Sequence, residues 1–310
     1  MKALVTGAAG FIGSHLSERL VASGVEVLGI DAFTDYYPRE RKERNLAALR
    51  GQPGFRLVEG DLLKADLPSL LDGVSHVFHL AAQAGVRHSW GRDFRVYTVN
   101  NVEATQALLE ACVRQPIERL VYASSSSVYG DEVRLPMRED ARPQPVSPYG
   151  VTKLAAEQLC YLYHVNYSVP TVSLRYFTVY GPRQRPDMGF HRFFRAALDD
   201  EPIPVFGDGR QTRDFTFVAD AVAATVAAST RGVPGAVYNI GGGSRVELLE
   251  VFEVIRRVTG HPLRLERTEA QRGDMRDTFA DTTRARAELG FAPSVTLEQG
   301  LRAQYEWMHG

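Results

Sequence analysis

A tyrosine and a lysine four residues apart, Tyr149 and Lys153 in "SPYGVTK", have the types and spacing for proton transfer. Ser147 resembles a helix N-cap and Pro148 a first helical residue, which predicts Tyr149 and Lys153 on one helix face, one turn apart. The pKa of a phenol is about 10, and a nearby ammonium, a helix N-terminus or an oxidised cofactor would favour the phenolate. Such a phenolate could remove the proton of a secondary alcohol while a cofactor takes hydride from the same carbon. The alternative is an ordinary pair of surface side chains.

A serine run, "SSSSVYG" from Ser124 to Gly130, follows an apolar segment and precedes this helix. A hydroxyl at the end of a strand could share a hydrogen bond with the reacting alcohol. Taken alone, the four serines could equally form a turn.

A glycine-rich loop supplies a candidate site for a dinucleotide. Gly7, Gly10 and Gly13 in "VTGAAGFIGSH" follow the first predicted strand and open a helix, with the spacing G-x-x-G-x-x-G. Glycines beside a helix N-terminus let backbone N–H groups approach a pyrophosphate without obstruction. The same pattern could also be a simple tight turn between strand and helix.

Acidic residues after the next two strands strengthen the dinucleotide interpretation. Asp31 ends the second predicted strand, eighteen residues after Gly13, where a carboxylate would bind the adenosine ribose hydroxyls. It would also repel a 2′-phosphate, which predicts NAD rather than NADP. Asp61 and Leu62 follow the third strand and are expected to contact the adenine edge.

The candidate residues lie on predicted strands and helices that alternate along the chain, which indicates an α/β fold. Apolar runs without alternation indicate strands buried on both faces of a parallel sheet that is covered by helices. They lie at residues 2–8, 26–32, 55–61, 76–82, 119–125, 170–177 and 236–242. From about residue 178 Pro and Gly become frequent and the strands shorter, which predicts a smaller lobe. We therefore expect a first domain over 1–177 with a return segment at about 214–240, and a second lobe over 178–213 and 241–310.

Composition and net charge limit the kinds of partner that the protein is expected to bind. The chain has 310 residues and a formal net charge of −1, which favours neither nucleic acid nor an anionic membrane. The basic cluster "PRERKER" is expected to be a solvated helix face. Cys112 and Cys160 lack metal-ligand spacing, so we expect no metal site and a reducing compartment. No apolar run is long enough to cross a bilayer, and the chain is predicted to be cytoplasmic.

Several motifs together resemble the extended short-chain dehydrogenase/reductases of the NAD-dependent epimerase/dehydratase family, which act on nucleotide sugars. These are "TGAAGFIG", "HLAAQ", "SSSSVYG", "SPYGVTK", "LRYFTVYGPRQRPDM" and "GDGRQTRDFTFVAD", and they span nearly the whole chain. Within the family, "GIDAFTDYY", "AAQAGVRHSW" and "YFTVYGPRQRPDMGFHRF" are most similar to UDP-glucuronate 4-epimerases. The resemblance implies a doubly wound Rossmann domain with a smaller α/β lobe that binds the UDP-sugar. It also implies bound NAD and a homodimer formed through helices near 101–114 and 149–167.

The resemblance also implies roles for individual residues. Tyr149 matches the catalytic base, Lys153 its partner and a ligand of the nicotinamide ribose, and Ser125 the hydroxyl beside it. Matches to cofactor contacts, besides Tyr149 and Lys153, are Gly7, Gly10, Phe11, Ile12, Gly13, Asp31, Asp61, Leu62, Leu80, Ala81 and Gln83. Matches to substrate contacts are Ser127, Thr178, Arg185, Phe206 near the uracil, Arg213 at the diphosphate, Arg272 and Asp274. The last two stand in "QRGD", which lacks the Pro of the family's Pro-Gly-Asp run.

Differences from other members of the resembled family help to predict which reaction the chain catalyses. Dehydratases of the family carry Asp-Glu where this chain has Ser126 and Ser127, and UDP-glucuronate decarboxylases carry an acid at the Ser127 position. UDP-glucose epimerases commonly have Asn at the position of Thr178. Arg185, seven residues further on, could donate hydrogen bonds to a sugar carboxylate or could be a solvated loop cation.

Oxidation of C4 in a glucuronate creates a β-keto acid that loses carbon dioxide readily. Donors from Thr178, Ser127 and Arg185 would keep charge on the carboxylate and fix its orientation, which opposes that loss. We therefore expect epimerisation of UDP-glucuronate to UDP-galacturonate through C4 oxidation, rotation of the 4-keto sugar and re-reduction on the opposite face. UDP-glucose 4-epimerase, UDP-glucuronate decarboxylase and a dinucleotide-sensing protein remain alternatives.

Overall fold

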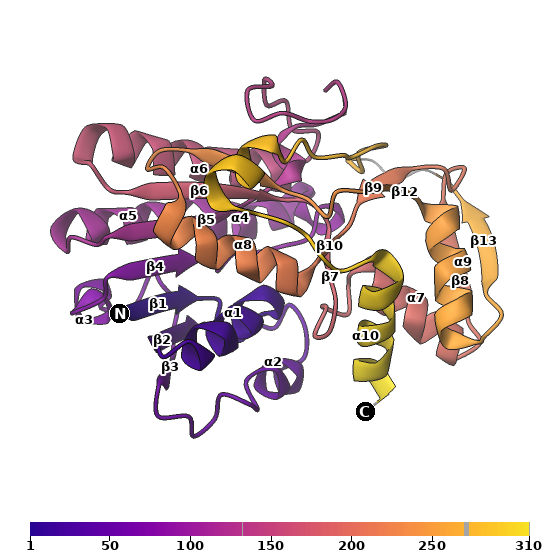
Figure 1. Ribbon diagram of the computed structural model, residues 1–310, viewed down its shortest axis with the longest axis horizontal. Helices are drawn as coiled ribbons and strands as arrows, with labels where there is room; N and C mark the ends of the chain where they lie inside the picture. The colour runs from indigo at the N-terminus through magenta and orange to yellow at the C-terminus, as the bar shows by residue number, and fades with distance from the viewer. Residues whose placement is uncertain (132, 270–272, 310) are drawn as a thin grey trace.

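A seven-stranded parallel sheet forms the centre of the computed structural model, which describes residues 1–131, 133–269 and 273–309 (Figure 1). The strand order is β11-β6-β5-β4-β1-β2-β3, and every neighbouring pair is parallel. The strands are β1 (Lys2–Thr6), β2 (Glu26–Asp31), β3 (Phe55–Glu59), β4 (His76–His79), β5 (Arg119–Ser125), β6 (Thr171–Tyr176) and β11 (Val237–Ile240). All seven lie in the segments that the sequence predicts.

Burial of the central strands explains their continuous apolar sequences. All four residues of β4 and all six of β6 are buried, because helices cover both faces of the sheet. The edge strand β3 is mostly exposed. The predicted fold class, a doubly wound parallel sheet with a smaller α/β lobe, is confirmed.

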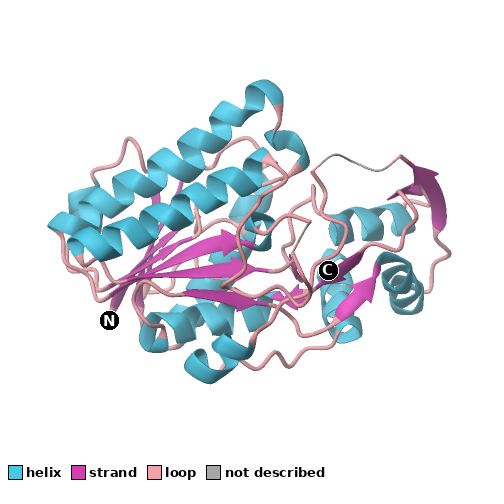
Figure 2. Cartoon of the chain, turned by 90° about the horizontal axis from the view of Figure 1, so that it is seen from above, coloured by secondary structure: helices cyan, strands magenta, loops and turns pink. Residues whose placement is uncertain are grey.

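Helices cover the two faces of the sheet in two layers (Figure 2). On one face α1 (Phe11–Ala22) packs beside α8 (Val218–Arg231), and apolar side chains such as Leu16 and Ala221 share one core. On the other face α3 (Leu67–Leu71), α5 (Ala104–Arg114) and α6 (Pro148–Tyr167) enclose a second core that includes Leu108 and Ala156. The remaining helical segments before residue 148 are α2 (Arg39–Asn45), η1 (Arg87–Ser89), η2 (Gly91–Asp93), α4 (Phe94–Tyr97), η3 (Thr98–Glu103) and η4 (Ser126–Val128).

A smaller lobe lies at the end of the sheet where the strands finish, on the right in Figure 1. Its own core joins aromatic residues such as Phe190, Phe194 and Phe252. Its helical segments are α7 (Gly189–Leu198), α9 (Leu248–Thr259) and α10 (Leu297–His309), and η5 (Ala285–Leu289) packs back against α8. Its short strands pair two by two: β7 (Val179–Tyr180) with β10 (Thr216–Phe217), β8 (Pro202–Phe206) with β13 (Arg264–Thr268), and β9 (Thr212–Asp214) with β12 (Arg245–Glu247).

The topology determines where a ligand can bind. From β1 the chain builds β2 and β3 on one side, and then crosses to build β4, β5 and β6 on the other. A crevice forms at the carboxyl ends of the strands on either side of such a switch point. The loop after β1, Asp31 at the end of β2 and the serines at the end of β5 all lie at this edge. No helix in the described ranges combines the length and apolarity needed to span a membrane.

Candidate active site

The glycine loop leaves a backbone cradle at the start of α1. Gly7 has a positive φ of 70°, and a Cβ there would lie 2.9 Å from the backbone nitrogen of Ala81. A Cβ on Gly13 would lie 2.1 Å from the carbonyl oxygen of Gly7, so only glycine allows the helix to pack this close. The N-cap of α1 is Gly10, without a side-chain cap. The first-turn N–H groups therefore face the cavity and fit a pyrophosphate.

Asp31 is held where the ribose hydroxyls of a dinucleotide would lie. Its Oδ2 accepts a hydrogen bond from the backbone of Ala9 at 3.1 Å and its Oδ1 one from Phe33 at 2.8 Å. The Nζ of Lys42 lies 3.7 Å from the carboxylate and donates to the carbonyl of Thr34 at 3.0 Å.

The prediction that "PRERKER" forms a solvated helix face is wrong for Lys42. This side chain is only 5% exposed, and burial lowers its pKa although Asp31 opposes that effect. The reason is tertiary: α2 turns Lys42 toward the cavity, where its ammonium lies over the rings of Phe33 and Tyr37, 5.9 and 5.0 Å from the ring centroids.

Buried polar side chains order the segment after β4. The hydroxyl of Thr6 accepts hydrogen bonds from the backbone N–H groups of Leu80 and Ala81 at 3.1 and 3.0 Å. The amide of Asn101 binds both backbone groups of Gln83, at 2.7 Å through Oδ1 and 3.0 Å through Nδ2. These hydrogen bonds fix the backbone of residues 80–83, which form one wall of the cavity.

The predicted N-cap of α6 is confirmed. Ser147 accepts a hydrogen bond from the backbone of Gly150 at 3.1 Å, and Pro148 is the first residue of α6. Lys153 is buried in the following turn, and its Nζ donates to the carbonyl of Ala123 in β5 at 2.8 Å. Burial lowers the pKa of Lys153 to about 8. The lysine thus ties α6 to the strand that carries the serines.

Tyr149 is the titratable group best placed for proton transfer. Burial raises the pKa of its phenol above the ordinary value, and the charge of Arg185 offsets that effect only in part. The edge of the Tyr97 ring packs against it, with 6.2 Å between ring centroids. A desolvated phenol beside a cation and a hydroxyl donor is suited to hold or release a proton.

A buried ion pair joins α6 to β6, the strand beside β5. Arg175 of β6 donates to Glu157 of α6 at 2.6 Å through Nη2 and at 3.0 Å through Nε. The hydroxyl of Ser124 donates to the same carboxylate at 2.6 Å. The side chains of Arg175 and Glu157 are only 4% and 2% exposed.

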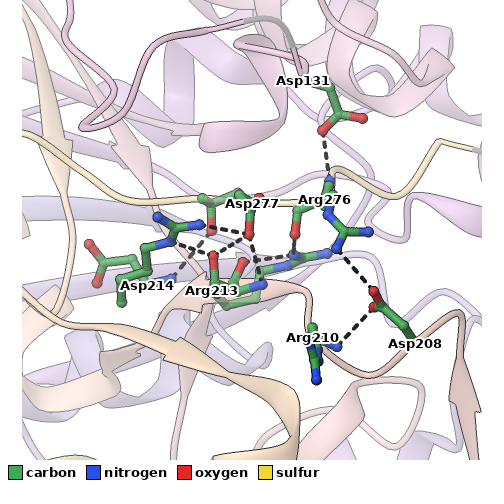
Figure 3. A network of polar contacts seen from close by, with 10 residues as sticks. Asp131, Asp208, Arg210, Arg213, Asp214, Arg276 and Asp277 are labelled. Carbon is green, nitrogen blue, oxygen red and sulfur yellow. Dashed lines mark hydrogen bonds and ion pairs between the residues drawn. The ribbon is translucent and has the colours of Figure 1, made fainter.

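The smaller lobe brings a second set of polar groups together. The ring of Phe206 is covered by the guanidinium of Arg87 at 4.2 Å, and Arg87 pairs with Asp274 at 2.6 Å. Arg213 donates through Nη1 to the carbonyls of Thr212 and Arg276 at 2.8 and 2.9 Å (Figure 3). Burial lowers the pKa of Arg213, while Asp274 opposes that effect.

One cavity collects most of the predicted residues. All predicted cofactor contacts line it together with Arg185: Gly7, Gly10, Phe11, Ile12, Gly13, Asp31, Asp61, Leu62, Leu80, Ala81, Gln83, Tyr149 and Lys153. Ser125, Ser127, Thr178, Phe206, Arg213 and Asp274 are not part of this lining. Ser127 follows β5 and donates its backbone N–H to Ser125, and Thr178 connects β6 to β7. Arg272 lies outside the described residues.

Sequence reasoning missed several residues of the site. Tyr36, Tyr37 and Lys42 line the cavity, and Arg87 joins Phe206 and Asp274. The signal for Arg87 and Tyr36 was present, because both stand in the motifs "AAQAGVRHSW" and "GIDAFTDYY" that carry the family resemblance. The burial of Lys42 could not be predicted, because nothing in a run of basic residues distinguishes the one that becomes buried.

This arrangement can bind a dinucleotide and exchange a proton with an alcohol at its reactive end. The cradle at Gly7 and Gly13 fits the pyrophosphate, and Asp31 fits an unphosphorylated ribose. In the described parts of the chain, no group of three His, Cys, Asp or Glu side chains is arranged to hold a metal ion.

Comparisons with known proteins agree with the geometry. The chain is 44% identical to "Uncharacterized UDP-glucose epimerase YtcB" of Bacillus subtilis, over 99% of this chain and 98% of that protein. It superposes on the crystal structure of UDP-glucuronic acid 4-epimerase from Bacillus cereus, in complex with UDP-glucuronic acid and NAD, with a TM-score of 0.97. The sequence identity there is 44%, and the match covers 100% of this chain and 99% of the other.

MoeE5 has been solved with NAD and UDP-glucuronic acid, and also with NAD and UDP-glucose. It matches at 45% and 44% identity with TM-scores of 0.91 and 0.90, over 100% of this chain and 99% of that protein. The family model described as "NAD dependent epimerase/dehydratase family" matches residues 3–241. From its motifs, its sheet and its cofactor cavity, the chain belongs to the NAD-dependent epimerase/dehydratase family.

Proposed function

We propose that this protein is an NAD-dependent UDP-glucuronate 4-epimerase that interconverts UDP-glucuronate and UDP-galacturonate. The observation that carries the proposal is that Arg185 lines the same cavity as Tyr149 and the cofactor cradle. A cation beside the catalytic phenol suits a sugar whose C5 substituent is a carboxylate. The relatives solved with UDP-glucuronic acid and NAD support the same substrate.

In this proposal the chain's own groups handle the proton and the orientation of the sugar. The Oη of Tyr149 takes the proton of the sugar 4-hydroxyl and returns it at the end of the cycle. The charge of Arg185 favours the anionic form of that oxygen, and the hydroxyl of Ser125 is proposed to donate a hydrogen bond to it during the reaction. The hydrogen bond from Lys153 to the carbonyl of Ala123 holds α6 on β5. It thereby fixes the position of the Tyr149 phenol relative to the cofactor cavity. Bound NAD supplies a hydride acceptor that returns the hydride, so no net redox change occurs.

The diphosphate and uracil are assigned to the smaller lobe. We propose that Arg213 binds the diphosphate and that Phe206 lies near the uracil, with Arg87 and Asp274 beside them. Ser127 and Thr178 are proposed to face the C5 substituent, as the resemblance implies. The division into 1–177 with 214–240, and 178–213 with 241–310, is also proposed, and β11 in the main sheet supports the return segment.

UDP-glucose remains a second candidate substrate for a structural reason. The charge of Arg185 is already balanced by Asp187, with Nη2 and Oδ2 2.9 Å apart, so a neutral sugar would not leave an unpaired cation. The same cavity could therefore accept a C5 hydroxymethyl group, and MoeE5 has been solved with UDP-glucose.

Product analysis by NMR, from UDP-glucuronate and UDP-glucose in parallel, tests the proposal. We expect UDP-galacturonate from the first substrate, slower or absent turnover of the second, and loss of both in Tyr149→Phe. Conversion of UDP-glucose alone would establish the second candidate. If neither sugar is converted and Tyr149→Phe changes nothing measurable, the chain is a dinucleotide sensor and the proposal is wrong.

We further propose a homodimer formed through α6. Along this helix large apolar side chains are exposed to solvent: Val151, Tyr161, Leu162, Val165 and Tyr167. A shallow hollow on this face is lined mainly by apolar atoms, from Ala155, Leu159, Tyr161, Leu162 and Val165 together with Gln158 and Asn166. A contiguous apolar face of this kind marks an interface, and a second copy would cover it symmetrically.

A further inference from the structure

The guanidinium of Arg185 is held along one edge by a carboxylate two residues away. Its Nε donates to Oδ1 of Asp187 at 3.0 Å and its Nη2 to Oδ2 at 2.9 Å. A guanidinium has five N–H donors in one plane. Among the described residues Nη1 has no hydrogen-bond partner, so the edge formed by Nη1 and the second hydrogen of Nη2 remains available. That edge can bind a second carboxylate in a bidentate manner.

Asp187 is itself held by a residue from the main sheet's side of the chain, Tyr36, which follows β2. The hydroxyl of Tyr36 donates to Oδ2 of Asp187 at 3.2 Å, and the Tyr36 ring lies 5.9 Å from the guanidinium carbon of Arg185. Tyr36 lines the cavity and belongs to the segment that follows Asp31. The side chain of Arg185 is therefore fixed by a loop of the smaller lobe and by a loop of the main sheet.

The charge states of this triad are stable over the working range of pH. Burial, and then the charge of Asp187, raise the pKa of Tyr36, so the phenol remains a donor. Burial raises the pKa of Asp187, but Arg185 and Tyr36 outweigh it and hold that pKa below its usual range. The pair stays ionised, which preserves its geometry.

We propose that Asp187 is a positioning residue that turns the free edge of Arg185 toward the C5 carboxylate of the sugar, and that Tyr36 fixes Asp187. The inference rests on the proposed function, since only a uronate has that carboxylate. Both carboxylate oxygens of Asp187 already accept hydrogen bonds from Arg185 or Tyr36, so Asp187 acts on the substrate through Arg185.

The consequence concerns the fate of the 4-keto intermediate. Loss of carbon dioxide requires the C5–C6 bond to lie parallel to the π orbital of the C4 carbonyl. The electron pair of that bond then forms the C4–C5 double bond of an enolate, carbon dioxide leaves, and C5 takes a proton from water. The product is a UDP-4-keto-pentose, and the hydride taken from C4 stays on the cofactor. A fixed Arg185 holds the carboxylate in one orientation and opposes this alignment.

Measurement of the partition between epimer and carbon dioxide tests the inference. UDP-glucuronate labelled at C6 is given to the wild type, Asp187→Ala, Asp187→Asn and Tyr36→Phe, with Arg185→Ala as reference. Released carbon dioxide, UDP-galacturonate and reduced nicotinamide are measured per turnover. KM for UDP-glucuronate and the dissociation constant of UDP-glucose are also measured for each variant, so that an effect on the carboxylate is separated from a general loss of sugar binding. The matched control is Glu18→Gln, which breaks the 2.7 Å ion pair of Arg183 in the same loop but lies outside the cavity lining.

We expect Asp187→Ala to raise the released fraction and KM for UDP-glucuronate by about tenfold or more, as expected for the loss of charged hydrogen bonds. The dissociation constant of UDP-glucose should change less than about twofold. Asp187→Asn keeps one acceptor and should lie between Asp187→Ala and the wild type. Tyr36→Phe should show a smaller effect in the same direction.

The possible failures are distinguishable. If the wild type makes UDP-galacturonate and the Asp187 and Tyr36 variants match Glu18→Gln, the inference is wrong and the proposed function stands. If the wild type converts only UDP-glucose, both are wrong. Should Asp187→Ala fail to fold, as judged by circular dichroism, Asp187→Asn and Tyr36→Phe decide the question alone.

Discussion

The buried ion pair beneath the active site predicts a large loss of stability when one partner is removed. Glu157→Leu would leave the guanidinium of Arg175, whose side chain is 4% exposed, without its carboxylate. Breaking a buried pair from one side costs about 3–5 kcal/mol, because the remaining charge is uncompensated. The hydroxyl of Ser124 would also lose its acceptor, for about 1 kcal/mol more. The summed loss is a large fraction of the free energy of unfolding of a typical protein, which is about 5–15 kcal/mol.

A double-mutant cycle in urea measures this loss. Unfolding is followed by far-ultraviolet circular dichroism at one fixed concentration of NAD, because bound ligand adds to apparent stability. Arg175→Leu should be as harmful as Glu157→Leu. The double variant should recover most of the loss, since replacing both charges by apolar groups is often close to neutral. Asp199→Asn, which breaks the exposed pair of Arg195 and Asp199 in α7, is the matched control and should cost under about 1 kcal/mol.

Two results would refute this reasoning. Single variants that lose no more stability than Asp199→Asn would mean that the pair does not hold α6 on the sheet. A double variant whose loss equals the sum of the single losses would mean that the two charges are not coupled.

Two further predictions concern Lys153 and the exposed face of α6. Because burial lowers the folded-state pKa of Lys153 from 10.5 to about 8, the unfolded chain binds more protons between these values, and stability rises with pH through that window. Lys153→Met should therefore gain about 3 kcal/mol relative to the wild type at pH 7 and lose that advantage near pH 10 in urea titrations; an advantage independent of pH would contradict this. Leu162→Asp should convert the dimer to a monomer in light scattering coupled to gel filtration, whereas a monomeric wild type would disprove the interface.

Local physics explains why much of the fold could be predicted. Strands buried on both faces must be apolar without alternation, which is why β4, β5 and β6 lie within their predicted segments. The cap of α6 was readable because Ser147 and Pro148 act on the backbone beside them. The residues that line the candidate cofactor cavity could be predicted because they lie in one loop and at the ends of successive strands.

Contacts between segments that are far apart in the sequence could not be predicted in the same way. Arg87 and Asp274 are 187 positions apart, and Tyr36 and Asp187 are 151 positions apart. Only the packing of the smaller lobe against the main sheet brings them together. Lys42 was misjudged for the same reason, since its burial depends on where α2 docks and not on the composition of the helix.

The order of residues along the chain thus determined the sheet, the cofactor cradle and the spacing of Tyr149 and Lys153, because those depend on short-range geometry. The tertiary structure alone decided which charges face one another. Asp187 and Tyr36 hold Arg185, and Glu157 neutralises Arg175, because the folded backbone places them within hydrogen-bond distance. Helical periodicity can indicate partners one turn apart, but it carries no information about partners such as Tyr36 and Asp187, which are 151 positions apart.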